Sequence, residues 1–300
     1  MTSAPRCTVV IATRDRRTSL LQTIERLRAL PEQPPVIVVD NGSADGSVEA
    51  VRSAFPEVDV VALDHNIGAP ARNIGVERAT TPYVAFADDD SWWAPGALTR
   101  AGDLFDAHSQ LALVGARILV GPEDREDPTT AVMAASPLPP PPGMPGPAVL
   151  GFLACGAVVR RSAFLEVGGF DELLFFLGEE QRVALDLAAR GWHLAYDHAV
   201  VAHHHPSSPK DPVARRRRQL RNDALTAWLR RPARVAVART AALAVAALRG
   251  DRVAGGALGE VVVRLPRAWR SRTRLPRSVE SSVRALDRRP RTTPRKVPAS

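Results

Sequence analysis

Val-Ala-Phe-Ala-Asp-Asp-Asp, residues 84–90, joins an apolar run typical of a buried strand to three consecutive carboxylates. Adjacent acids at the exposed end of a strand repel one another unless a cation or a set of hydrogen-bond donors compensates their charge. Carboxylate oxygens suit hard cations such as Mg²⁺ or Mn²⁺, which are commonly held by one or two carboxylates together with substrate phosphates. A solvated acidic turn is the alternative for this segment taken alone.

The sequence before this junction alternates between strand and helix patterns. The strand patterns cover residues 7–13, 36–40, 58–63 and 83–87. Helical patterns separate them, such as the one with apolar Leu20, Ile24 and Leu27. This alternation predicts an α/β fold with a mostly parallel central sheet and right-handed crossovers.

Polar residues stand at the carboxyl ends of three of these strands, namely Thr13, Asp40 and Asp88. Sheets of this kind bind ligands beyond the carboxyl ends of their strands, so we expect these residues to share one edge. Neither Gly-x-Gly-x-x-Gly nor Gly-x-x-x-x-Gly-Lys follows the first strand. A dinucleotide-binding fold and a P-loop both lose support from that absence.

The later sequence is less regular. Residues 121–147 contain nine prolines and little apolar periodicity, which predicts an insertion or lid, partly polyproline II. Strand character returns over 150–160, and Ser162 is the expected cap of a short helix. Glu179-Glu180 begins a helix that continues through Ala189.

The net charge of +8 is unevenly distributed. Residues 1–214 hold 17 Lys and Arg against 27 Asp and Glu, whereas residues 215–300 hold 23 against 5. We therefore expect a folded domain over 1–214 and a basic, largely helical extension over 215–300 with a disordered end. The extension suits the anionic inner face of a membrane, where each Lys or Arg contributes roughly 1 kcal/mol, or nucleic acid. Its apolar run, Val235 to Leu248, falls short of the ~20 residues needed to span a bilayer.

Two further features indicate the compartment. Cys7 and Cys155 are the only cysteines, each within an apolar stretch, which argues against a disulfide framework and favours two buried small residues. The N-terminal residues lead into the first strand without a signal-peptide pattern. We expect a cytoplasmic location, or a peripheral one at the inner face of the plasma membrane.

Five segments together resemble the family 2 glycosyltransferases with the GT-A fold, and most of all their bacterial rhamnosyltransferase-like branch. The matching segments are Thr8-Val-Val-Ile-Ala-Thr13, Val38-Val-Asp-Asn-Gly-Ser43, Asn66-Ile-Gly68 with Ala71-Arg-Asn-Ile-Gly75, Phe86-Ala-Asp-Asp-Asp90, and Gly168-Gly-Phe-Asp171 with Gly178-Glu-Glu180. The match covers roughly residues 7–205. Each segment is weak alone, and their order and spacing make the signal specific.

The resemblance implies a nucleotide-sugar-dependent, inverting transferase that uses Mg²⁺ or Mn²⁺. It assigns the metal to Asp90 and, with it, Asp88, whose position often contacts the ribose in the family. Asp89 joins the nucleotide-sugar site, orients its neighbours or folds outward. A metal that bridges the diphosphate would stabilise the charge that develops on the leaving group.

Further residues of the nucleotide-sugar site follow from the same resemblance. Asp40 matches the acid that contacts the nucleobase, and its local alternative is a capping Asx turn before Gly42. Arg72 matches an arginine near the nucleotide, with a solvated helix position as the alternative. Thr13 and Arg14 fall where the family's nucleotide contacts begin. Asn66 and Asn73 are expected to fix loop geometry.

An inverting transfer needs a base that removes the proton of the acceptor hydroxyl. The family commonly has Glu-Asp where this chain has Glu179-Glu180, so the match assigns Glu180 to the usual aspartate and leaves open which glutamate is the base. Acids also favour the first turn of a helix because of the helix dipole. Among the aromatic and histidine residues, Trp92 and Trp93 wall the site or belong to the core, and His203 or His205 is favoured to reach the metal.

These observations predict a metal-dependent inverting glycosyltransferase that moves a sugar from a UDP- or dTDP-sugar to a lipid-linked or cell-wall polysaccharide acceptor. An anionic membrane surface is a further expected partner, through residues 215–296, and a nucleic-acid partner is not expected. A nucleotidyltransferase is the first alternative, although Thr13 to Arg17 lacks the Gly-rich loop of such enzymes. A degenerate protein that binds nucleotide or membrane without turnover is the second, because Glu179-Glu180 departs from the family pattern.

Overall fold

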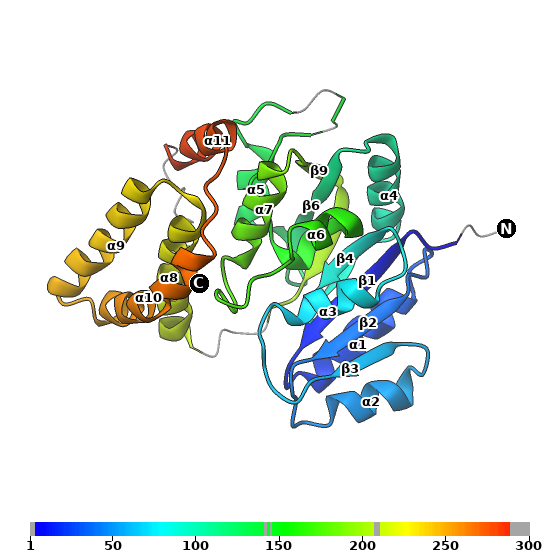
Figure 1. The fold of residues 1–300 in the computed structure, drawn as a ribbon. Coiled ribbons are helices and arrows are strands. Elements are labelled where there is room, and N and C mark those ends of the chain that lie inside the picture. Colours follow the sequence, from blue (N-terminus) through cyan, green and yellow to red (C-terminus); the bar gives the residue numbers. More distant parts are fainter. Residues whose placement is uncertain (1–3, 141–142, 145, 207–210, 289–300) are drawn as a thin grey trace.

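The computed structural model describes residues 4–140, 143–144, 146–206 and 211–288. Within this part, one mixed sheet has the strand order β3-β2-β1-β4-β8-β6-β9-β5, and β7 pairs with β6 beside it (Figure 1). The strands are β1 (Cys7–Thr13), β2 (Val36–Asp40), β3 (Asp59–Ala62), β4 (Tyr83–Ala87), β5 (Ser91–Trp93), β6 (Leu111–Val120), β7 (Arg125–Glu126), β8 (Ala157–Arg160) and β9 (His193–His204).

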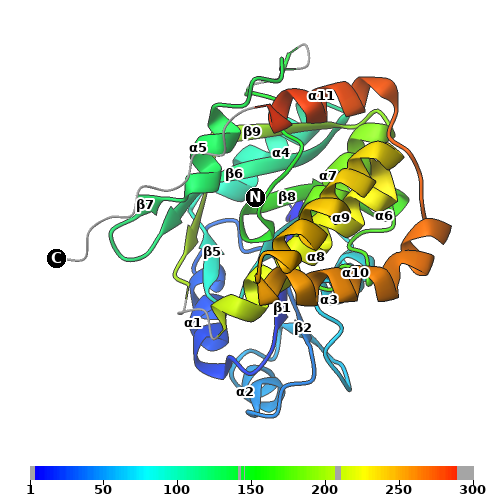
Figure 2. The same ribbon diagram turned by 90° about the vertical axis from the view of Figure 1, so that its left-hand side faces the viewer.

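Helices cover both faces of this sheet, and further helices lie beside it (Figures 1 and 2). They are α1 (Arg17–Arg28), α2 (Ser47–Ala54), α3 (Ala71–Arg78), α4 (Ala97–Ala107), α5 (Pro128–Ala134), α6 (Arg161–Glu166), α7 (Glu179–Ala189), α8 (Pro212–Arg230), α9 (Ala233–Leu248), α10 (Arg252–Arg270) and α11 (Arg277–Asp287). The apolar residues of α1 and α4 pack in one core cluster, and those of α3, α6 and α7 pack in another. Burial on both faces explains why the central strands are apolar throughout.

Strands β1 to β4 form the parallel half of the sheet, as predicted. Thr13 of β1 pairs with Asp40 of β2, and Ile11 pairs with Ala87 of β4. The residues that follow β4 therefore begin at the same edge as Thr13 and Asp40. The other half is mixed, because β8 runs antiparallel to both β4 and β6. The prediction of a mostly parallel sheet thus holds for the half that precedes the three acids.

Three local predictions are corrected by the structure. The strand expected over 150–160 is confined to Ala157–Arg160, and Ala154–Gly156 form a 3-10 turn instead. Ser162 does not cap its helix, because that helix begins at Arg161 and has Arg160 at its N-cap. The Pro-rich segment 121–147 contains β7 and α5, and its residues 141, 142 and 145 lie outside the described part of the chain.

The C-terminal helices α8, α9 and α10 lie together at the left of Figure 1, beside α7. They share a third core cluster with Leu173 and Leu174 of the segment that precedes α7. Arg230 of α8 also donates to Asp186 of α7, with 3.0 Å between Nη2 and Oδ2. The division into a domain over 1–214 and an extension over 215–300 stays a prediction, and the expected disordered end includes residues 289–300, which lie outside the described range.

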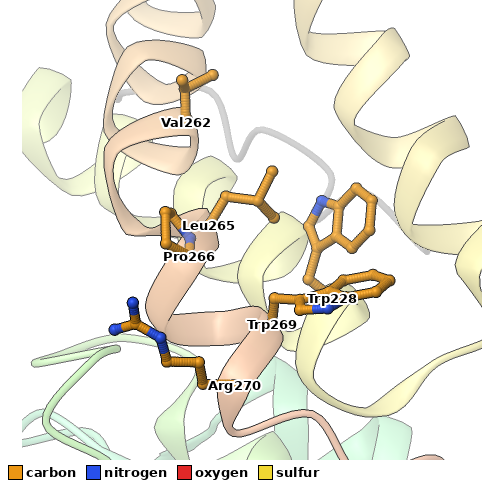
Figure 3. A pocket seen from close by; sticks show the side chains of 6 residues that line it. All are labelled: Trp228, Val262, Leu265, Pro266, Trp269 and Arg270. Carbon is orange, nitrogen blue, oxygen red and sulfur yellow. The ribbon is translucent and has the colours of Figure 1, made fainter.

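Several apolar side chains of these helices face solvent. Leu248 at the end of α9 is 88% exposed, and Val263 and Trp269 of α10 are 78% and 59% exposed. An apolar hollow of about 520 Å³ lies beside α8 and α10. Figure 3 shows the side chains that line it, among which Trp228 of α8 lies against Trp269 of α10. In the described residues, none of the helices is both long enough and apolar enough to cross a bilayer.

Candidate functional site

Each of the three carboxylates after β4 has a different partner. Asp88 forms an ion pair with Arg72 of α3. Asp89 accepts a hydrogen bond from the Thr13 hydroxyl, with 2.9 Å between Oγ1 and Oδ2. Asp90 lies 3.3 Å from Nε2 of His204 on β9. Donors from three elements therefore offset the repulsion within the acidic run, which is not a solvated turn.

Asp89 points into the protein rather than outward. The Thr23 hydroxyl of α1 donates to its backbone oxygen at 2.9 Å, so both the side chain and the main chain of Asp89 are fixed. Burial, followed by the negative charges of Asp88 and Asp90, raises the pKa of Asp89 to about 7. Asp89 thereby joins β1 to the acidic run, and the outward alternative is wrong.

Arg72 is buried in the site and is not a solvated helix residue. It is 5% exposed, and its Nε is buried without a hydrogen-bond partner among the described atoms. Asp88, Glu179 and Glu180 are the carboxylates whose charges act on its guanidinium. One arginine therefore contacts the acidic run and also lies near enough to the glutamate pair for both of its charges to act on it.

The two glutamates stand at the first turn of α7 in different environments. Glu179 is 1% exposed, and its Oε2 has no partner in the described structure. Burial, followed by the charge of Glu180, raises the pKa of Glu179 to about 8. Glu180 is only half-buried, its pKa is raised by burial, and its Oε2 lies 3.3 Å from the backbone nitrogen of Gly178. Glu180 is thus the member of the pair that an incoming molecule can reach. It also accepts a hydrogen bond from the Gly178 N–H at the start of α7, as a helix-capping acid would.

The loop that leads to these glutamates is held in an unusual conformation. Phe175 and Leu177 have φ angles of 65° and 72°, in the left-handed region that costs side-chain-bearing residues energy. The carbonyl oxygen of Phe175 accepts from Ala69 N–H at 2.7 Å. A Cβ at Gly68 would lie 2.2 Å from that oxygen, so this approach requires glycine. The loop before α7 is thereby joined to the loop before α3.

Asn222 of α8 secures the same loop, and sequence reasoning did not find it. Its side-chain nitrogen lies 2.8 Å from the carbonyl oxygen of Leu174, 3.0 Å from that of Phe176 and 2.6 Å from that of Leu177. The neighbouring Arg221 donates to Asn222 Oδ1 and to the Leu174 oxygen, each at 2.8 Å. A lone asparagine within a basic helix gives no sequence signal for such a role.

Asp40 can serve both of its predicted roles, the Asx turn before Gly42 and the contact with the nucleobase. Asp40 is 2% exposed and its Oδ1 accepts from Ser43 N–H at 2.7 Å, which is the expected Asx turn. Its Oδ2 is buried without a partner among the described atoms, so one acceptor stays available to a ligand N–H. Arg14 is set apart from this group, because its side chain is 50% exposed and pairs with Asp15. Asn66 accepts from Gly68 N–H within its own loop at 2.8 Å. Asn73 of α3 exchanges two hydrogen bonds, each of 2.9 Å, with the backbone of the distant Phe170.

The histidine run divides between two faces of β9, and the preference for His203 or His205 is wrong. Both of those rings lie against Trp92, at centroid distances of 5.5 and 4.7 Å, and the Arg26 guanidinium lies 3.7 Å from the Trp92 ring. His204 points to the opposite face, towards Asp90, because successive side chains alternate along a strand. Trp93 is fully buried in the core.

Donor atoms suited to a cation converge beside the acidic run. Side-chain ligand atoms of Asp88, His204 and Cys155 lie within 4.8 Å of one another, and Asp90 adjoins His204. Burial raises the pKa of the Cys155 thiol well above its usual value, so this group stays protonated near neutral pH. The remaining oxygen and nitrogen donors fit Mg²⁺ or Mn²⁺ better than a softer metal. The hydrogen bond to Asp90 and the charge of Asp88 outweigh burial and raise the pKa of His204.

Two family models match the sequence. Glycosyl transferase family 2 matches residues 8–168, and Glycosyl transferase family group 2 matches residues 143–258. The chain is 32% identical over 275 residues to a pre-mycofactocin glycosyltransferase of Mycobacterium tuberculosis, which covers 82% of this chain and 57% of that protein. It is 28% identical over 218 residues to the N-acetylglucosaminyl-diphospho-decaprenol L-rhamnosyltransferase of the same organism, covering 60% of this chain and 69% of that one. The chain thus spans little more than half the length of the first of these relatives.

Solved structures show the same fold at low sequence identity. The mannosyltransferase PcManGT of Pyrobaculum calidifontis, in complex with GDP-Man and Mn²⁺, has a TM-score of 0.58 and 20% identity, over 95% of this chain and 87% of that one. S. aureus TarS 1–349 with UDP-GlcNAc has a TM-score of 0.58 and 16% identity, over 74% and 66% of the two chains. The architecture is therefore the GT-A fold that the sequence predicts.

Proposed function

This chain belongs to glycosyl transferase family 2, and from that premise we propose that it moves a sugar from a nucleoside diphosphate sugar to an acceptor hydroxyl. The proposed donor is a UDP- or dTDP-sugar. The proposed acceptor is a lipid-linked or cell-wall polysaccharide glycan.

The observation that carries this proposal is the position of Arg72. Its buried guanidinium pairs with Asp88, and the negative charges of Glu179 and Glu180 favour its charged form. A transfer reaction needs the diphosphate and the attacking hydroxyl on opposite sides of one anomeric carbon, with complementary charge next to both. We assign the diphosphate to the acidic run, where a bound cation would offset the like charges, and the attacking hydroxyl to the glutamate pair. The charges of both groups act on Arg72.

We assign the nucleotide to the edge formed by the ends of β1 and β2. The free Oδ2 of Asp40 suits an imide N–H of uracil or thymine. Thr13 at the end of β1 donates to Asp89 and so fixes the position of that side chain at the same edge. Arg14, which is exposed, would pair with a phosphate of the bound nucleotide.

We assign the base to Glu180, whose pKa is raised by burial, with Glu179 as its buried neighbour. The Glu180 carboxylate takes the proton of the acceptor hydroxyl while that oxygen bonds to the anomeric carbon. The bond from the same carbon to the diphosphate oxygen breaks, and the nucleoside diphosphate leaves with the bonding pair. Attack opposite the leaving group inverts the anomeric configuration.

Asp90, Asp88 and His204 are the residues that would hold Mg²⁺ or Mn²⁺. The fit rests on their oxygen and nitrogen donors, which converge beside the acidic run. When bound, the cation would offset the negative charge that develops on the departing diphosphate. Metal use by a neighbour of the same fold, the Mn²⁺ complex of PcManGT, supports this proposal.

The test combines a donor panel with three variants. UDP- and dTDP-sugars are incubated with Mg²⁺ or Mn²⁺ and candidate acceptors, and mass spectrometry detects the product. Glu180→Gln should lower kcat by about 10²- to 10⁴-fold, the usual contribution of a general base. Glu179→Gln should keep most of the rate, and Glu77→Gln, at an exposed position of α3, is the matched control. Wild-type product formation equal to that of Glu180→Gln and Asp90→Ala with every donor would reject the enzyme in favour of a non-catalytic nucleotide binder.

A further inference from the structure

A groove of about 520 Å³ lies between α8, α10 and the loop that precedes α7. Four arginines line it, and we call it the arginine groove: Arg218 and Arg221 from α8, Arg264 and Arg267 from α10. Glu172 is the acid among its lining residues. Its remaining walls are apolar and include Phe175 and Val263.

Acidic side chains only partly compensate these arginines. Glu260 is shared, at 2.8 Å from Arg221 and 3.6 Å from Arg264, and it also pairs with Arg217 outside the groove. Glu172 pairs with Arg267 at 3.0 Å. Burial lowers the pKa of Arg221, and the positive charges of Arg264 and Arg218 act in the same direction. The groove therefore keeps an excess of positive charge.

Arg218 lies beside an apolar wall of the groove. Its guanidinium lies 5.7 Å from the centroid of the Phe175 ring. Val263 on the opposite helix is 78% exposed. Arginine forks match phosphate oxygens with paired N–H donors, and aromatic and aliphatic walls suit a hydrocarbon chain. The combination of both in one groove fits a phosphate ester of an apolar alcohol better than a free inorganic anion.

The groove is also connected to the proposed base. Arg221 donates to the carbonyl oxygen of Leu174, and the chain runs from there to Glu180. Phe175, which lines the groove, is the residue whose oxygen accepts from Ala69 in the loop before α3. A molecule in the groove would thus lie along the segment that carries Glu180 into the site, on the acceptor side of the reaction.

We propose that the arginine groove binds the diphosphate of an acceptor whose sugar is carried by an apolar chain. The arginines hold the phosphate oxygens, and Phe175 and Val263 lie against the first carbons of the chain. The sugar then extends towards Glu180. The identity of this molecule as an acceptor rests on the proposed function, whereas its binding requires no turnover.

Calorimetric titration of the full chain with farnesyl diphosphate tests the proposal. EDTA is present throughout, so that the metal-dependent donor site does not take up the probe. Arg218→Gln and Arg267→Gln should each weaken binding about tenfold, since a hydrogen bond to a charged group contributes roughly 1.5–3 kcal/mol. Arg252 is an exposed arginine of α10 that does not line the arginine groove. Arg252→Gln makes the same charge change and should leave binding unchanged.

A second arm separates the possible sources of the phosphate. Inorganic pyrophosphate should bind more weakly than farnesyl diphosphate, and farnesol should not bind measurably. Equal affinity for pyrophosphate and farnesyl diphosphate would overturn the assignment to a lipid-linked diphosphate. Equal losses in Arg252→Gln and Arg218→Gln would show non-specific charge attraction and overturn the site itself.

Failure of this proposal is separable from failure of the proposed function. Hydrolysis of the donor sugar in the absence of acceptor depends on the acidic run and not on the groove. We expect Arg218→Gln to raise the KM for a lipid-linked acceptor, and Arg252→Gln, outside the groove, to leave both that KM and donor hydrolysis at the wild-type values. Farnesyl diphosphate binding without any donor turnover would leave the groove in place and reject the transferase.

Discussion

The side-chain nitrogen of Asn222 lies 2.6 Å from the carbonyl oxygen of Leu177, two residues before Glu179. Asn222 belongs to α8, beyond the last strand of the sheet, and it is fully buried. Its contact fixes a loop whose backbone would otherwise relax, because Phe175 and Leu177 are held at positive φ. The C-terminal helices thereby set where the glutamate pair stands.

Replacing Asn222 with leucine should therefore change kcat more than nucleotide affinity. The substitution leaves three carbonyl oxygens without their donor, which costs about 1–3 kcal/mol of unfolding free energy for each one left buried and unpaired. Asp88 pairs with Arg72 of α3, and Asp90 lies beside His204 of β9, so the metal and nucleotide side of the site is positioned by elements other than α8. Kd for UDP with Mn²⁺ should therefore stay within about twofold of wild type. Gln219→Leu, at an exposed position of the same helix, is the control. A parallel loss of UDP affinity and kcat would show general misfolding and would contradict a positioning role.

Ionisation of Glu179 at high pH should make the metal-free protein less stable. The pKa of this carboxyl is about 8 in the folded protein, above its ordinary value of 4.5. The stabilisation is complete below the unfolded pKa and is lost as pH rises through the folded pKa. A difference of one in pKa between the two states corresponds to about 1.4 kcal/mol, so the loss of stability between pH 4 and pH 9 is on the order of 5 kcal/mol.

Glu179→Gln isolates this effect, because glutamine does not titrate. Urea unfolding in EDTA should give similar free energies for variant and wild type near pH 4 and a more stable variant near pH 9. Glu77→Gln should follow wild type at both values. Parallel curves for Glu179→Gln and wild type across the range would show that the carboxyl is not buried as described.

Cation binding should depend on Asp90 and on pH. Asp90→Asn should weaken Mn²⁺ binding by about 10-fold or more, since even outer-shell partners of metal sites commonly cost 10- to 100-fold. Binding should tighten from pH 6 to pH 8, because the protons on Asp89, whose pKa is about 7, and on His204 oppose the cation. Electron paramagnetic resonance of free Mn²⁺ measures both effects. Asp124→Asn, at an exposed carboxylate paired with His203, should bind like wild type, and a pH-independent affinity would contradict the coupling.

The exposed apolar residues of α9 and α10 predict contact with an anionic membrane surface. Leu248→Ser and Trp269→Ser should each reduce co-sedimentation with vesicles that contain phosphatidylglycerol, and added salt should reduce it for every variant. Val132→Ser removes a comparably exposed residue, 57% exposed on α5, and should have no effect. Equal sedimentation with neutral phosphatidylcholine vesicles would reject an electrostatic contribution.

The first half of the sheet was predictable because each strand is a contiguous apolar run and each one ends in a polar residue. Pairing of Thr13 with Asp40 follows from that pattern alone. The second half was not predictable, since β8 is inserted between β4 and β6 after a long Pro-rich segment. Antiparallel pairing across such a distance leaves no local signal.

Within the site, the acids were predictable and their partners were not. Asp88 to Asp90 follow a recognisable strand, whereas Asn222 contacts a loop 45 residues earlier in the chain. His204 is a different case, because the alternation of side chains along a strand already separates it from His203 and His205. Alternation shows that His204 cannot share a face with His203 and His205. Which of the two faces meets the acids could be decided only once the structure had placed Asp90.

Asp186 of α7 accepts from Arg230 of α8 and also pairs with Arg182 at 2.8 Å, all three side chains being largely buried. Separation of α7 from α8 would leave this carboxylate without half of its partners inside the protein, which is costly. The two helices should therefore open together, and the amide hydrogens of α7 should exchange with solvent at the same low rate as those of the middle of α8. The lifetime of the arrangement around Glu180 is then set by a helix that contributes no proposed catalytic group.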